Sequence, residues 1–148
     1  MREILFRAKA INRDPAGGYR THYKNGDWVY GLLSKVYDDR FDDMPAEFTN
    51  EDGISGIDVD LNTIGQYTGI NDAQGNKIFE GDILKCVSKL DYAYMVVIFE
   101  DGEFRLVKCE DYQTYTTGQG YYMVRCFHKE VIGNIFDNKE YIGDDING

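Results

Sequence analysis

The chain has 148 residues and a formal net charge of −10; 43% of its residues are hydrophobic and 28% are charged. This composition excludes a disordered chain, and a chain of this length buries enough surface to hold one domain or two small ones. The N-terminal residues lack the apolar core of a signal peptide, and no apolar run reaches the about 18 residues of a membrane span. We therefore expect a globular protein of the cytoplasm.

The first part of the chain predicts β structure. Residues 3–10 form the first candidate strand. Asn25-Gly26 then separates two segments rich in aromatic and β-branched residues, YRTHYK and DWVYGLL. Asn-Gly between such segments predicts a hairpin with a type I′ turn, because both central residues of that turn need positive φ angles.

A strongly acidic segment follows. Nine acidic residues and one basic residue lie between Asp38 and Asp60, so this segment carries most of the net negative charge. Its proline and glycine predict a long loop or a boundary over residues 38–53, and residues 45–48 are the best helix candidate, as one short turn. The segment is typical of a solvated loop; a surface that docks on a basic partner is the alternative.

Further candidate strands fill most of the second half of the chain. They are residues 54–59, 77–80, 82–88, 120–127 and 131–136. The dipeptide at 101–102, Asp-Gly, predicts a second type I′ hairpin, in which Glu100 and Glu103 stand opposite each other and point into water. We expect a mainly β fold of two small packed β units, residues 1–62 with the acidic loop and residues 63–148.

Four glycines punctuate the stretch from Thr63 to Leu84, TIGQYTGINDAQGNKIFEGDIL. The stretch lacks the GxxxxGK[ST] pattern of a phosphate loop, and as a calcium loop it places lysine and isoleucine where glycine and glutamate are required. We therefore predict turns instead of a ligand loop. One turn surrounds Gly75; in the other, Gly81 takes a positive φ and the Asp82 side chain accepts a backbone N–H bond.

The three cysteines, Cys86, Cys109 and Cys126, are odd in number and show no CxxC spacing, which indicates neither a disulfide framework nor a zinc knuckle. With His128 they could supply zinc ligands, or Cys126 and His128 a nucleophile and its base. The spacings match no compact zinc motif, and no third, orienting group stands out. Free, buried cysteines in a reducing setting are the favoured interpretation. Whether the four residues come together is left open.

Aromatic side chains gather in the segment that contains Tyr112, Tyr115, Tyr121 and Tyr122. Such residues could stack on nucleic-acid bases, but the sixteen lysines and arginines of the chain are scattered and form no basic run. The favoured interpretation is strand packing or a protein interface. The sequence thus argues against nucleic acid as a partner.

Several motifs, taken in order, resemble the YopX family of phage and prophage proteins. The matching motifs are MREILFRA, DWVYGLL, VDLNTIGQYTGINDAQGNKIFEGDIL, VIFEDGEF and EVIGNIFDN. The resemblance runs from Met1 to about Asn138; the chain departs from the family where Asn138-Lys139 replaces an asparagine-proline pair, and residues 112–128 match no family motif. It implies a compact, mostly β protein of a phage or prophage, with a partly open SH3-like barrel in the second half and no assigned catalytic residues.

From these observations we expect a non-enzymatic module for protein interaction or self-assembly, with the Asp38–Asp60 segment or exposed aromatic residues as its contact surface. A homo-oligomer would fit, because β-rich chains must pair or cover their strand edges. We predict no catalytic, cofactor-binding or metal-binding residue and no cofactor. The alternatives are an enzyme that acts on a small molecule or nucleotide through a carboxylate-lined cleft, and a nucleic-acid-binding barrel.

Overall fold

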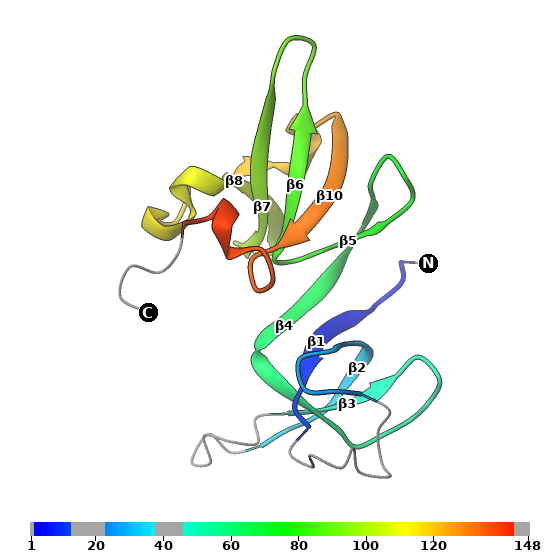
Figure 1. The fold of residues 1–148 in the computed structure, drawn as a ribbon. Helices are drawn as coiled ribbons and strands as arrows, with labels where there is room; N and C mark the ends of the chain where they lie inside the picture. Colours follow the sequence, from blue (N-terminus) through cyan, green and yellow to red (C-terminus); the bar gives the residue numbers. More distant parts are fainter. Residues whose placement is uncertain (1, 13–22, 38–45, 144–148) are drawn as a thin grey trace. The chain divides into compact units, whose positions relative to one another are not determined.

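The structure, a computed structural model, describes residues 2–12, 23–37 and 46–143. Two antiparallel five-stranded sheets account for most of these residues, so the prediction of a mainly β fold is confirmed (Figure 1). The strands are β1 (Phe6–Ala10), β2 (Trp28–Val36), β3 (Ala46–Asn50), β4 (Ile57–Asn71), β5 (Lys77–Phe79), β6 (Asp82–Val87), β7 (Tyr92–Glu100), β8 (Glu103–Lys108), β9 (Tyr121–Tyr122) and β10 (His128–Asn134). Three short 3₁₀ helices are η1 (Cys109–Thr114), η2 (Met123–Arg125) and η3 (Lys139–Tyr141).

The chain divides into two compact units, Met1–Tyr67 and Thr68–Gly148. The long strand β4 runs through the boundary, and Asn62, near which we expected the division, lies inside this strand. A strand of 15 residues crosses the boundary because its first part pairs with β1 and β3 and its last part with β5.

The first sheet has the strand order β1-β2-β3-β4-β5, and β1 also pairs with β4. This extra pairing closes part of the sheet into a ring, with a register shift in β1 between Arg7 and Lys9. The ring surrounds the core of the first unit, where Val29, Phe48 and Val59 are fully buried. The alternation of buried and exposed residues along these strands is the period of two that a sheet with one apolar face requires.

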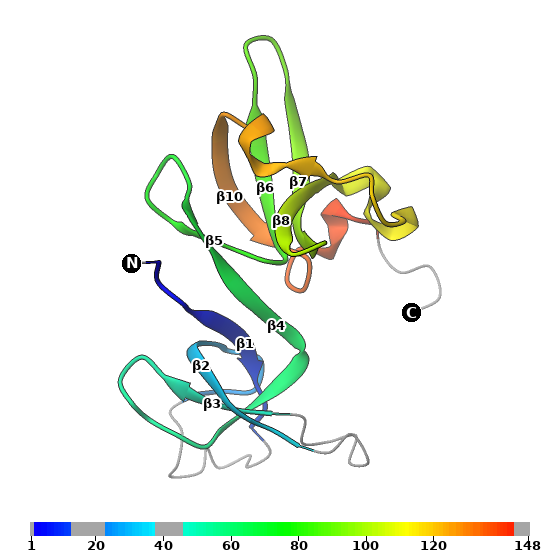
Figure 2. The same ribbon diagram turned by 180° about the vertical axis from the view of Figure 1, so that it is seen from behind.

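The second sheet has the order β10-β6-β7-β8-β9, so the last strand of the unit pairs with the first strand of the sheet. Figure 1 shows β10, β6 and β7 side by side, and Figure 2 shows β8 beside β7 from behind. Among the described residues the pairings of this sheet form an open order and not a clear barrel, so the partly open SH3-like barrel stays a prediction.

Side chains from the second sheet fill a core on each of its faces, as neighbours in sequence alternate between them. Leu84, Met95 and Leu106 pack on one face together with Met123 of η2. Ile83 packs on the other face, in a cluster with Val96 and Cys109. Both faces of the sheet are thus covered, which explains why its central strands read as nearly continuous apolar runs.

The two predicted hairpin turns have different outcomes. Asp101 and Gly102 have φ angles of 51° and 79°, so the type I′ turn between β7 and β8 is confirmed. At Asn25-Gly26 only the glycine has a positive φ, of 90°, and the Asp27 N–H donates to the Lys24 carbonyl oxygen at 3.0 Å. This is the pattern of a type II turn.

Strand β2, which follows the Asn25-Gly26 turn, pairs with β1 and β3. Tyr23 and Lys24, which precede the turn, are not in a strand. The prediction of a type I′ hairpin at Asn25-Gly26 is therefore wrong. Strand β1 pairs with β2 at the position where the sequence pattern predicted the segment just before Asn25-Gly26.

Other local predictions are also wrong. Residues 46–48 belong to strand β3, not to a helical turn, because pairing with β2 on one side and β4 on the other stabilises the extended conformation. Of the predicted strand 120–127, Tyr121–Tyr122 form strand β9, and η2 follows at once. Residues 38–45 of the predicted acidic loop lie outside the described residues.

Glu100 and Glu103 stand opposite each other, as predicted, but they do not simply point into water. Glu103 forms an ion pair with Arg105 at 2.6 Å. Glu100 accepts hydrogen bonds from the Tyr115 hydroxyl and from the Gly118 N–H at 2.5 Å. These bonds, the one from Tyr115 first, hold the pKa of Glu100 below its usual value. Each carboxylate thus has its own partner, which offsets the repulsion between them.

The turn between β5 and β6 matches its prediction. Gly81 has a φ of 90°, and the Asp82 side chain accepts a hydrogen bond from the Phe79 N–H at 2.8 Å. The backbone of Gly81 donates to Val97 and accepts from Ile135, so neighbouring segments fix its conformation. Asp82 is almost fully buried, at 1% exposure.

Replacement of this glycine tests the turn. We expect Gly81→Val to lower the free energy of unfolding by about 1–3 kcal/mol, because a β-branched residue is strained at this positive φ. Urea denaturation measures the loss. Gly81→Asn is the control, since asparagine enters the left-handed region more easily and should cost less; equal stability of the valine variant and the wild type would contradict the turn assignment.

Candidate functional site

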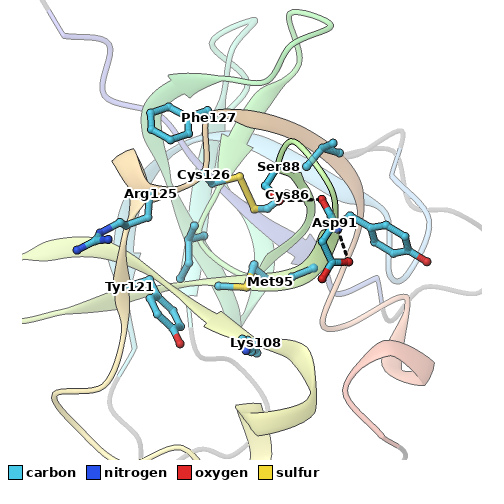
Figure 3. Close-up of a pocket in the computed structure, with 13 residues that line it drawn as sticks. Cys86, Ser88, Asp91, Met95, Lys108, Tyr121, Arg125, Cys126 and Phe127 are labelled. Carbon is cyan, nitrogen blue, oxygen red and sulfur yellow. Dashed lines mark hydrogen bonds between the residues drawn. A yellow bond between two sulfur atoms is a disulfide. The ribbon is translucent and has the colours of Figure 1, made fainter.

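A cavity of about 290 Å³ lies in the second unit, among strands β6, β7 and β8 and the segment that leads into β10. We call it the aromatic hollow (Figure 3). Its floor is apolar: Met95 and Leu106 are 6% and 1% exposed, and Ala93 lies beside them. Its rim carries Tyr92 and Phe127, which are 54% and 92% exposed.

Pairing between strands explains this arrangement. In β6 and β7, Cys86 stands opposite Ala93, and both side chains share a face with Met95; the next pair, Val87 and Tyr92, lies on the other face at the edge of the cavity. The β6–β7 turn is closed by hydrogen bonds from Ser88 to the Asp91 carbonyl oxygen. The opposite wall comes from β9 and the residues after it, which supply Tyr121 and Phe127.

Two cations and one carboxylate lie at the hollow. Lys108 is half-buried at the end of β8, and Arg125 is exposed in η2. Within residues 2–12, 23–37 and 46–143, neither side chain has a hydrogen bond or an ion pair. The carboxylate is that of Asp91, whose Oδ1 accepts the Tyr92 N–H at 2.7 Å. The hollow therefore has a positive excess although the whole chain is acidic.

A second cavity, of about 390 Å³, shares Asp91, Tyr92, Ala93 and Lys108 with the aromatic hollow. Its further lining includes Glu110 of η1 and Tyr141 of η3. Asp91 and Glu110 are its carboxylates within the described part of the chain, and both are exposed.

The predicted cysteine and histidine candidates are not brought together as a metal site. Cys86 and Cys126 form a disulfide, with Cα atoms 5.5 Å apart, that lies in the wall of the aromatic hollow. Cys109 is free and buried in the opposite core, where burial raises the pKa of its thiol to about 11. His128 is exposed. Over the described ranges, no three His, Cys, Asp or Glu residues are arranged to hold a metal ion.

Two interpretations from the sequence are therefore corrected. Cys86 and Cys126 are not free cysteines, since the pairing of β10 with β6 brings them together across 40 residues of sequence. The proposed nucleophile pair of Cys126 and His128 also fails, because the sulfur of Cys126 is bonded to Cys86 and carries no thiol.

Asp72, the residue at which a calcium loop in the stretch from Thr63 to Leu84 would begin, has a structural role. It is 7% exposed and accepts four hydrogen bonds. Oδ1 accepts from the backbone N–H groups of Gln74 and Asn76, and Oδ2 from the Asn76 side chain and the Val131 N–H. Burial alone would raise the pKa of Asp72, but these bonds outweigh it and leave the pKa below its usual value.

The aromatic residues singled out from the sequence have separate roles. Tyr121 lines the aromatic hollow. Tyr122 lies 5.4 Å from the Arg105 guanidinium, measured to the ring centroid. Tyr115 binds Glu100, and Tyr112 packs against the core around Cys109, where burial raises its pKa. Packing therefore accounts for most of this group, with Tyr121 as the residue at a candidate site.

The described part of the acidic segment contains strand β3 and the start of β4. Glu47 of β3 stands opposite Asp58 of β4, a like-charge pair, and the Tyr37 hydroxyl donates a hydrogen bond to Glu47. This bond, first among the causes, raises the pKa of Tyr37. No helix within the described residues is both long and apolar enough to cross a membrane.

No sequence motif marks the lining residues Tyr92, Lys108, Arg125 and Phe127. They lie on separate strands and turns, so no local motif joins them. The one local signal was hydrophobic: Phe127 is the last residue of a predicted strand and would be unusual as an exposed residue.

Comparisons with known proteins give a family from one search and a similar fold from another. The family model described as "YopX protein" matches residues 19–142 of the chain. The crystal structure of protein EF1440 from Enterococcus faecalis is similar, with a TM-score of 0.50 and 22% sequence identity over 97% of this chain and 100% of that one. At this identity the likeness concerns the fold alone. No curated protein matches the chain.

The disulfide predicts a definite count of thiols. After equilibration with air, denaturation and alkylation should modify one cysteine, Cys109, and prior reduction should allow three to be modified. Reduction should also lower the free energy of unfolding by about 3–4 kcal/mol, the chain-entropy value for a closed loop of this length. Mass spectrometry and urea denaturation measure the two effects.

The double variant Cys86→Ser/Cys126→Ser is the control for these experiments, since its stability should not respond to reductant. Three thiols in the unreduced wild type would contradict the disulfide.

The hydrogen bonds of Asp72 predict a pH dependence. Asp72→Asn should lower stability at pH 7 by about 1–3 kcal/mol, because an amide turns an N–H₂ group toward backbone donors. Since the folded pKa is below the ordinary 3.8, the advantage of the carboxylate is complete above that value and is lost as pH falls through the folded pKa. Thermal melts from pH 2 to pH 7 should show the wild type and the variant converging at acid pH. The exposed Asp52→Asn is the control; a constant difference across the range would contradict this role.

Proposed function

We propose, from the premise that the chain belongs to the YopX family, that it is a non-enzymatic module for protein interaction, encoded by a phage or prophage and active in the host cytoplasm. The aromatic hollow of the second unit is its contact surface. The phage context rests on the family resemblance of the motifs, and the binding role rests on the hollow.

The observation that carries the proposal is the combination of exposed aromatic rings with an apolar floor. Phe127 is 92% exposed at the rim, while Met95 and Leu106 below it are almost completely buried. Exposed large apolar residues around a concave surface are typical of binding sites, since they cost solubility when nothing covers them. Aromatic residues also dominate the energetics of protein interfaces.

An enzyme with a carboxylate-lined cleft is supported less well. Such an enzyme needs two converging acids whose protonation is tuned by their surroundings. Among the described residues that line the hollow, Asp91 is the carboxylate, and it already accepts the Tyr92 N–H. In the second cavity Asp91 and Glu110 are both exposed.

A nucleic-acid-binding barrel is also supported less well. It needs a contiguous basic surface, because the contacts with phosphates supply most of the affinity. The net charge of −10 opposes such contacts, and Lys85 and Arg105 near the hollow lie against tyrosine rings.

Affinity purification of the tagged full chain from induced host cells tests the proposal. We expect the wild type to retain a specific set of proteins, including other copies of the chain if it self-assembles, and Phe127→Ser to lose at least one of them. Val124→Ser is the matched control, since Val124 is 75% exposed and only three residues away, but does not line the hollow. Quantitative mass spectrometry compares the three samples.

The proposal fails if Phe127→Ser retains the same proteins as the wild type. A wild type that retains no specific protein and has a monomeric mass in solution also overturns it. Both variants change exposed residues, and thermal melts confirm that they are folded before the comparison.

A further inference from the structure

The aromatic hollow combines an apolar interior with a positive rim in a chain that is otherwise acidic. Lys108 and Arg125 both line it, and among the described residues neither is engaged by a carboxylate. Figure 3 shows Arg125 beside Tyr121 on one side of the hollow and Asp91 on the other. Among the described residues that line the hollow, the carboxylate is that of Asp91, whose Oδ1 accepts the Tyr92 N–H at 2.7 Å.

The size of the hollow limits what it can hold. A volume of about 290 Å³ lies at the lower end of the range for small-molecule sites, roughly 300–1,000 Å³. It is large enough for one or two apolar side chains. Its floor of Met95, Leu106 and the Cys86–Cys126 disulfide offers such a side chain no polar atom to bind. Methionine also adapts its shape to different partners.

We propose that the aromatic hollow binds an extended peptide segment in which one large apolar or aromatic side chain stands next to aspartate or glutamate. This inference rests on the proposed interaction function and names the chemistry of the partner. The apolar side chain enters beside Phe127 and contacts Met95. The neighbouring carboxylate faces Lys108 or Arg125.

Charge complementarity argues for this occupant. A neutral or basic peptide would leave the two cations without partners, and a basic one would be repelled by them. Rim charges contribute more to the choice of partner and the rate of encounter than to affinity, whereas buried apolar anchors carry most of the affinity. Mutation of the apolar lining should therefore reduce affinity, whereas mutation of Lys108 or Arg125 should change which peptides are preferred.

Single-stranded nucleic acid is the competing occupant for a surface with aromatic rings and cations. It requires a positively charged groove that follows several phosphates. Among the described residues at the hollow, the cations are Lys108 and Arg125, and Asp91 of the β6–β7 turn adds a negative charge. The chemistry of the hollow thus favours a peptide with a local acidic group.

Selection from a random dodecamer peptide library on the immobilised full chain tests the inference. We expect the wild type to enrich peptides with phenylalanine, tryptophan, leucine or methionine next to aspartate or glutamate. The double variant Lys108→Glu/Arg125→Glu should instead enrich lysine and arginine at that position. Val124→Ser should select the same peptides as the wild type.

Titration of one selected, fluorescently labelled peptide separates the two parts of the hollow. Phe127→Ser should weaken its binding at least tenfold, and Arg125→Glu should weaken it mainly when the peptide carries its acidic residue. If the double variant is less stable than the wild type in thermal melts, Arg125→Glu alone replaces it, because Arg125 is exposed.

The possible outcomes distinguish this inference from the proposed function. Enrichment of peptides without acidic residues, or of none, overturns the inference, while the loss of cellular partners from Phe127→Ser would still support the function. If labelled oligo(dT) at 50 mM salt binds the hollow and displaces the peptide, nucleic acid is the occupant and the inference is wrong. If Phe127→Ser loses neither peptides nor cellular partners, both proposals fall.

Discussion

The pairing of β10 with β6 is the contact on which the second unit depends. It joins His128–Asn134 to Asp82–Val87, two segments that are more than 40 residues apart in sequence. The closure entropy of such a long loop has to be offset by burial and hydrogen bonds. Three features follow from this one pairing: the disulfide between Cys86 and Cys126, the hydrogen bond from Val131 to Asp72, and the position of Phe127 at the aromatic hollow.

The parts of the fold that could be predicted from the sequence are those with a local cause. Asp101-Gly102 forms its type I′ turn, and Gly81 has its positive φ, because the residue types themselves permit few alternatives. Where pairing with a strand distant in sequence determines the conformation, the local sequence pattern gave a wrong prediction. Residues 46–48 have a helical pattern but lie in β3, since β2 and β4 pair with them on both sides.

The candidate site could not be predicted for the same reason. Its aromatic and basic residues come from β7, β8, η2 and the bend before β10, and nothing in the spacing of Tyr92, Lys108, Arg125 and Phe127 marks them as neighbours. The cysteines gave a signal, but their spacing suggested zinc or free thiols because the antiparallel pairing that joins two of them is not visible in sequence. A concave surface is a property of the assembled sheet.

Asp72 connects two parts of the second unit that are far apart in sequence. One carboxylate holds the turn between β4 and β5 and also the Val131 N–H of β10, 59 residues away. Opening of the turn therefore removes an acceptor from the edge strand, and detachment of that strand removes a donor from the turn. Native-state hydrogen exchange would register this as a cooperative opening unit, in which the amides of Gln74, Asn76 and Val131 share one protection factor although different strands contain them.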